Sequence, residues 1–188
     1  MPNSDAHHAS SSNPADATEA TAAAPDAPTT GAAAAPHRTT GAAAAASPEE
    51  LTALQAQWAP LLEDTLVERC GMQVLSLGAD GGVMTMPVAG NTQPAGLLHG
   101  GATIALAETV ASLAATLHAR AVHGEGAHAV GTSVSALHHR SARQGEVRAT
   151  CTARQLGGKV ASYLVDVHDE AGVLISTVTV STMLLAPR

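Results

Sequence analysis

The chain has 188 residues with 9 basic and 16 acidic side chains, so its formal net charge is −7. A negative net charge argues against a nucleic-acid-binding protein, which needs a basic surface. Hydrophobic residues make up 45% of the chain, as in a globular domain, but aromatic residues make up only 1%. We therefore expect an aliphatic core that buries little area per side chain, so the domain would gain from oligomerisation.

Residues 1 to 46 consist largely of Ala, Pro, Thr, Ser and Asp and hold almost no large aliphatic side chain. Such a segment cannot bury enough apolar surface to offset the entropy lost on ordering. We predict a disordered tail over 1–46 and one folded domain over 47–188.

The two cysteines, Cys70 and Cys151, form no CxxC motif, so we expect neither a disulfide framework nor a metal cluster. Small core thiols of this kind are typical of a reducing compartment. No basic stretch followed by an apolar one stands at the N-terminus, so no secretory signal is evident. A cytoplasmic location is the resulting expectation.

Helical order is predicted from the stretch Ser47-Pro48-Glu49-Glu50. Its serine is an N-cap, its proline takes the first helical position, and its second glutamate closes a capping box. The helix should run to about Trp58, restart at Pro60 and continue to about Arg69, where Gly71 ends it.

The pattern then changes to strands around one long helix. A hairpin of strands 72–77 and 83–88 is expected around the turn Asp80-Gly81-Gly82. The long helix should run from Gly100 to about Ala119, with a connection over 120–127. Four further strands are expected over 128–139, 145–155, 159–168 and 173–185. This order of helix, hairpin, long helix and antiparallel meander predicts an α+β fold.

The long helix has two faces. Large aliphatic residues recur at helical spacing and should face the core: Leu106, Val110, Leu113 and Leu117. Glu108 lies about 200° round the helix from Leu106, among small neighbours: Ala105, Ala111, Ser112 and Ala115. We expect a second copy of the helix to cover this face across a dimer dyad. A transmembrane span over 97–117 is the alternative, which the polar residues of the helix disfavour.

The helix begins with the step His99-Gly100-Gly101, after the polar loop Asn91–Leu98. Glycines let a ligand approach the backbone closely, and the first helical N–H groups lack partners within the helix. Glu108 has no basic residue within one helical turn. A buried carboxylate without a cation is either a structural group or, more often, a functional one.

Several segments together resemble the hotdog-fold acyl-CoA thioesterases of the PaaI and hydroxybenzoyl-CoA type, whose catalytic acid is a helix glutamate. The resemblance covers about residues 48–186. The matching segments are Met86-Pro87-Val88, Gln93–Ala102, Leu106-Ala107-Glu108-Thr109, Val130-Gly131-Thr132, His138-His139-Arg140, Gly145-Glu146-Val147-Arg148 and Leu156-Gly157. It implies an antiparallel sheet of five or six strands wrapped around the long helix. It also implies paired subunits, commonly as a dimer of dimers, with sites at the dimer interface.

The resemblance also implies roles for individual residues. Glu108 would attack the thioester carbonyl or activate water, and both mechanisms remain open. The Gly100 N–H would hold the oxyanion, helped by the positive end of the helix. Gln93 and His99 match polarising and positioning side chains, and Ser112 matches a hydroxyl that orients water or the carboxylate. No metal or cofactor is expected, since CoA is part of the substrate.

Two groups could bind the CoA phosphates. The residues His138, His139 and Arg140 end a predicted strand, and Gly157, Gly158 and Lys159 form a predicted turn. An arginine fork matches phosphate geometry, and glycine turns expose N–H groups.

The spacing of the catalytic candidates predicts a composite site. Gly100 and Glu108 are eight residues apart, or ~12 Å of helical rise, too far to grip one carbonyl carbon. Antiparallel helices at a dyad would bring Glu108 of one subunit near Gly100 of the other.

The chain departs from the family pattern at two positions. Ala95 stands where the family has an aromatic residue, and Ser135 stands where the family often has an asparagine. An acyl-CoA thioesterase for aromatic or small acyl groups is the first hypothesis, and a non-catalytic acyl-CoA-binding protein is the alternative.

Overall fold

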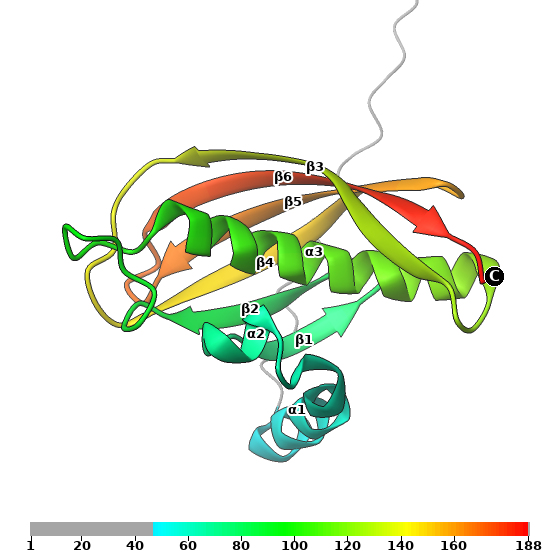
Figure 1. Cartoon of the computed structure of the whole chain (residues 1–188), viewed down its shortest axis with the longest axis horizontal. Helices are drawn as coiled ribbons and strands as arrows, with labels where there is room; N and C mark the ends of the chain where they lie inside the picture. Colours follow the sequence, from blue (N-terminus) through cyan, green and yellow to red (C-terminus); the bar gives the residue numbers. More distant parts are fainter. Residues whose placement is uncertain (1–46, 188) are drawn as a thin grey trace, which may run out of the picture. The chain divides into compact units, whose positions relative to one another are not determined.

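The structure, a computed structural model, describes residues 47–187 (Figure 1). The tail predicted over 1–46 lies outside the described residues. Three helices are present: α1 (Pro48–Leu62), α2 (Leu66–Arg69) and α3 (Gly100–His123). Six strands accompany them: β1 (Gln73–Gly78), β2 (Gly81–Pro87), β3 (His128–His138), β4 (Glu146–Leu156), β5 (Val160–Asp169) and β6 (Leu174–Leu185).

The six strands form one antiparallel sheet in the order β1-β2-β4-β5-β6-β3, and α3 packs against it. This is the hotdog fold that the resemblance implies, so the prediction of the fold is confirmed. The first hairpin is also confirmed, although its turn lies one residue earlier, because Gly78 pairs with Gly81.

The predicted meander of the last four strands is wrong in one respect. Strands β4, β5 and β6 are sequential neighbours, but β3 pairs with β6 at the far edge, while β4 pairs with β2. Helix α3 separates β2 from β3 in the chain and runs along the sheet, with β3 at the edge opposite β1 (Figure 1). Hydrophobic alternation identifies a strand but not its partner.

The N-terminal helix does not break at Pro60. Helix α1 continues through Pro60 to Leu62, although this proline has no N–H to donate to the helical ladder. The break comes at Asp64, whose φ of 59° is left-handed. Thr65 then caps α2 by accepting a hydrogen bond from the Val67 N–H at 3.2 Å. The capping contact predicted for the Glu50 side chain lies outside what the structure describes.

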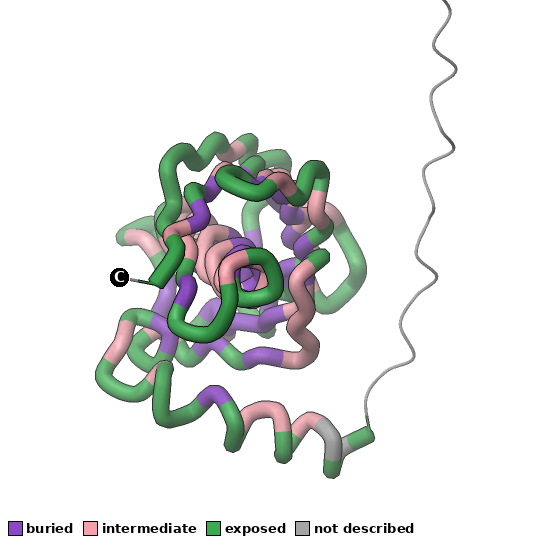
Figure 2. The backbone as a smooth tube through the Cα atoms, turned by 90° about the vertical axis from the view of Figure 1, so that its right-hand side faces the viewer, coloured by how far each residue is buried: buried purple, intermediate pink, exposed green. Residues whose placement is uncertain are grey.

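The core-facing side of α3 differs from the predicted stripe. Leu106 and Val110 are fully buried, whereas Leu113 and Leu117 are only partly buried. Two alanines expected at a dimer dyad, Ala111 and Ala115, are instead fully buried inside this subunit. The reason is the curvature of the sheet, which contacts α3 through all six strands and encloses it (Figure 2). Small side chains allow the strands to approach the helix from more than one side.

Among the described residues, α3 is the one helix long and apolar enough to cross a membrane by length and composition. Its contacts with all six strands are those of the core helix of a globular domain. The last strand alternates between a buried and a more exposed face. Val178, Val180 and Thr182 of β6 face the core.

Candidate active site

The start of α3 leaves backbone N–H groups without acceptors inside the helix. His99 is the N-cap residue, and its Nδ1 accepts a hydrogen bond from the Gly101 N–H at 2.8 Å. The His99 carbonyl accepts from the Thr103 N–H at 3.1 Å. Within residues 47–187, the Gly100 N–H has no acceptor. It therefore lies unpaired at the positive end of a helix of 24 residues.

Asn91 fixes the loop that leads to this helix. Its Nδ2 donates to the carbonyls of Cys70 and Pro87, both at 2.8 Å, and its own carbonyl accepts from the His99 N–H at 2.9 Å. Sequence analysis missed this role. The only signal available was an asparagine, a typical turn residue, in the loop that follows β2. The contacts set the position of Gln93, whose Oε1 accepts from the Ala95 N–H at 3.2 Å.

His138 lies against the start of α3 from the end of β3. Its Nδ1 is 2.7 Å from the Oγ of Ser176 on β6. The opposite edge of the ring faces Gly100 so closely that a Cβ at residue 100 would lie 2.8 Å from Nε2. The close contact with His138 therefore favours glycine at position 100, because any larger residue would displace the imidazole.

These groups surround a cavity of about 490 Å³. Five of the predicted site residues line it: Gln93, Gly100, His138, His139 and Arg140. The structure thus brings one part of the predicted catalytic set together with one part of the predicted CoA-binding set. Sequence analysis missed Thr103, Ile175 and Ser176, which complete the wall. Because Ser176 is distant in sequence, only its pairing with β3 could have revealed it.

His138 and His139 point to different partners, as expected for successive residues of a strand. His139 Nε2 is 3.0 Å from the Thr177 Oγ1, which in turn donates to Asp166 at 3.1 Å. Ser176 is buried and Thr177 only partly so, because they lie on opposite faces of β6. His138 is accordingly the histidine that faces the helix start.

Glu108 does not line this cavity. It lies two turns along α3, partly buried, with its Oε1 2.8 Å from where a Cβ at Gly131 of β3 would stand. Ser112 follows it by one turn, and its buried hydroxyl has no hydrogen-bond partner within residues 47–187. Ser112 therefore makes no hydrogen bond to Glu108 in this subunit. The four-residue spacing puts both side chains on one face of α3, but it does not fix their rotamers.

The turn Gly157-Gly158-Lys159 lies at the other end of α3. The Gly157 carbonyl is 2.9 Å from His118 Nε2, and the Gly158 carbonyl is 2.7 Å from His123 Nε2. From Gly100 to His118 the helix rises ~27 Å. Within one subunit, the two groups predicted to bind CoA phosphates are therefore far apart.

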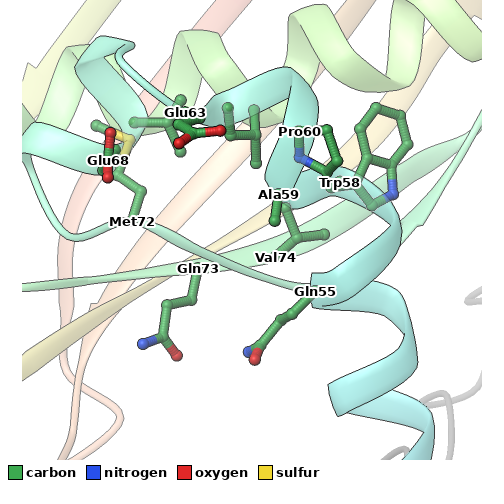
Figure 3. A pocket seen from close by; sticks show the side chains of 11 residues that line it. Gln55, Trp58, Ala59, Pro60, Glu63, Glu68, Met72, Gln73 and Val74 are labelled. Atoms are coloured by element: carbon green, nitrogen blue, oxygen red, sulfur yellow. The ribbon is translucent and has the colours of Figure 1, made fainter.

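A second cavity of about 510 Å³ lies between α1, α2 and β1. Its walls include Trp58, Met72 and Val74, with the carboxylates of Glu63 and Glu68 among the lining side chains (Figure 3). It contains none of the predicted site residues.

Cys151 is not a candidate nucleophile. Burial, together with the nearby Asp80, raises the pKa of Cys151 to about 12, so the thiol stays protonated at neutral pH. Burial also raises the pKa of Tyr163, and the electrostatic effects of Cys151 and Asp80 raise it further. Its hydroxyl donates to the Ala79 carbonyl at 2.9 Å. Over residues 47–187, no three His, Cys, Asp or Glu side chains are grouped so as to hold a metal.

Comparison with known proteins gives concordant results. A family profile described as "Thioesterase superfamily" matches residues 95–176. The proofreading thioesterase EntH of Cronobacter turicensis is 43% identical over 122 residues, which are 64% of this chain and 86% of that protein. EntH of Cronobacter sakazakii matches to the same extent.

Solved structures agree with these relatives. The crystal structure of thioesterase HI1161 from Haemophilus influenzae superposes with a TM-score of 0.64 at 32% identity, over 72% of this chain and 90% of that one. A mutant of thioesterase PA1618 from Pseudomonas aeruginosa also gives 0.64, at 26% identity over 70% of this chain and 93% of that one.

Proposed function

Because the chain belongs to the thioesterase superfamily and is a thioester hydrolase, we propose that it cleaves acyl-CoA thioesters to a free acid and CoA. One observation carries this proposal, namely the unpaired Gly100 N–H at the start of α3, beside a cavity lined by polar side chains. The alternative of a non-catalytic binder is set aside by the family assignment.

The start of α3 would stabilise the oxyanion. A thioester carbonyl placed in the cavity could accept a hydrogen bond from the Gly100 N–H, along the axis of the helix. Gln93 lines the same cavity and could polarise that carbonyl. His99 would act indirectly, because its ring accepts a hydrogen bond from the Gly101 N–H and so caps the helix start.

Glu108 would serve as the nucleophile or as the base that activates water. Its carboxylate is partly buried and forms no ion pair among residues 47–187. The ~12 Å of helix between Gly100 and Glu108 again requires a second subunit, whose helix start would face this carboxylate. The buried hydroxyl of Ser112 would then find its partner in the water or carboxylate of the assembled site.

The edge strand β3 supports a dimer. It carries three exposed apolar side chains, Val130, Val134 and Leu137, and its outer backbone edge pairs with no other strand of residues 47–187. Edges of this kind pair readily with another chain. Because Glu108 packs against Gly131 of β3, a partner at this edge would lie close to the carboxylate.

An antiparallel dimer would also reunite the two phosphate-binding candidates. The end of one α3, with the turn Gly157-Gly158-Lys159, would lie near the start of the other, with His139 and Arg140. We propose that these groups bind the CoA phosphates together. A further pairing of dimers into a tetramer, of the PaaI type, is part of the same proposal.

For the acyl group we propose an aromatic or small acid, on the resemblance of the sequence to thioesterases of the PaaI and hydroxybenzoyl-CoA type. The positions Ala95 and Ser135, where the chain departs from the family pattern, are the ones expected to set its preference. A cytoplasmic location remains a proposal, supported by the two free cysteines.

The test is an acyl-CoA panel with detection of the free thiol, run with the wild type and Glu108→Ala. The expected result is hydrolysis of at least one aromatic or short acyl-CoA by the wild type alone. Equal rates for the two proteins would end the proposed role of Glu108, and no turnover across the panel would end the choice of acyl-CoA.

A further inference from the structure

A serine that belongs to none of the sequence motifs, Ser176, lines the cavity beside His138. Ser176 lies directly opposite His138 in the pairing of β3 with β6, and only 1% of it is exposed. Its Oγ is 2.7 Å from the His138 Nδ1. The backbone ladder therefore places hydroxyl and imidazole at hydrogen-bonding distance, and no loop movement is needed to form the contact.

The direction of this hydrogen bond follows from the surroundings of the hydroxyl. Among residues 47–187, Ser176 Oγ has no other hydrogen-bond partner. If His138 Nδ1–H donated to Oγ, the buried serine hydrogen would have no acceptor, which is unfavourable. The hydroxyl is satisfied when it donates to an unprotonated Nδ1, and a neutral imidazole then carries its proton on Nε2.

The Nε2 edge is the one that faces the site. It lies 2.8 Å from where a Cβ of Gly100 would stand, and His138 lines the same cavity as Gly100. We propose that Ser176 is a positioning residue that holds His138 as the Nε2–H tautomer. A second neutral donor then stands beside the Gly100 N–H for the thioester carbonyl oxygen. This inference rests on the proposed function and extends it to Ser176.

The remaining titratable groups around His138 are few. His139 and Arg140 line the same cavity, and His99 caps the adjacent helix start. Asp166 is tied to Thr177, on the other face of β6. None of these groups contacts Nδ1 of His138 in place of Ser176.

The experiment uses the full chain with three substitutions: Ser176→Ala, Ser176→Thr and Thr179→Ala. Ser176→Thr keeps the hydroxyl, and Thr179→Ala is the matched control, since Thr179 is an exposed residue of the same strand. The first readout is nitrogen NMR of labelled histidine, which distinguishes a protonated from an unprotonated ring nitrogen. The second is kcat and KM for acyl-CoA hydrolysis.

In the wild type, His138 should show a protonated Nε2 and an unprotonated Nδ1 at pH 8. Ser176→Ala should mix the two tautomers and lower kcat about two- to tenfold, the effect of one neutral hydrogen bond, with KM nearly unchanged. Ser176→Thr should restore the tautomer, and Thr179→Ala should change nothing.

A wild-type His138 protonated on Nδ1 would overturn the inference, as would a Ser176→Ala protein with unchanged tautomer and kcat. The NMR readout needs no substrate. If the wild type cleaved no acyl-CoA, the proposed substrate would fail, while the tautomer would still decide whether Ser176 orients His138.

Discussion

Replacing Gly100 with alanine would place a Cβ 2.8 Å from Nε2 of His138. Two effects on stability oppose each other. Alanine favours a helical position over glycine by about 1 kcal/mol, whereas forcing a methyl group into an occupied space costs about 1–3 kcal/mol. The net loss of stability should therefore stay below about 2 kcal/mol. Activity should fall much further, because the imidazole must leave the helix start.

The assay is a double-mutant cycle with Gly100→Ala, His138→Ala and both together. Urea unfolding gives the stabilities, and thiol release from acyl-CoA gives the rates. With the imidazole removed, Gly100→Ala should become neutral or stabilising, so the coupling free energy should be about 1–3 kcal/mol. If Gly100→Ala destabilised the His138→Ala background as much as the wild type, the contact would not be the reason for glycine at this position.

Three further predictions concern the carboxylate, the distal turn and the buried thiol. Glu108→Gln should lower kcat by about 10²-fold or more. The melting temperature should stay unchanged, because the carboxylate forms no ion pair within residues 47–187. Substantial residual hydrolysis in a thiol-release assay would contradict the catalytic role of Glu108. Lys159→Ala should raise KM for acyl-CoA but not for the matching acyl-pantetheine, which lacks the nucleotide phosphates, and equal effects on both would exclude a phosphate contact. The pKa of Cys151 is raised from 9.0 to about 12 in the folded protein, so the unfolded chain loses the thiol proton at lower pH. Stability should therefore fall as pH rises between these values. Melting temperatures of the wild type and Cys151→Ala across that range would show whether the thiol is responsible.

Local patterns were sufficient for the elements of this domain. The alternation of residues such as Val178 and Val180 predicts β6, and the step His99-Gly100-Gly101 predicts the start of α3. These are signals of short range, set by backbone geometry, side-chain period and capping. The resemblance of several segments to one family then supplied the fold, which the structure confirms.

Partners across the fold required the tertiary structure. The place of β3 beside β6 depends on where α3 delivers the chain, and the burial of Ala111 and Ala115 depends on how far the sheet curves around the helix. The pairing of His138 with Ser176 joins residues 38 positions apart. It arises from strand register, which no spacing within either strand encodes.

The sequence by itself determined which residues could do the chemistry, because a helix start with glycines and a carboxylate without a cation are visible in the order of residues. The tertiary structure decided which of them meet. Gln93, Gly100 and His138 share one cavity, while Glu108 lies farther along α3 and Lys159 lies in the turn beside the other end of that helix. The physical reason is that a rigid helix separates its two ends by a fixed rise per residue, so only the sheet, or a second subunit, can bring other groups to either end.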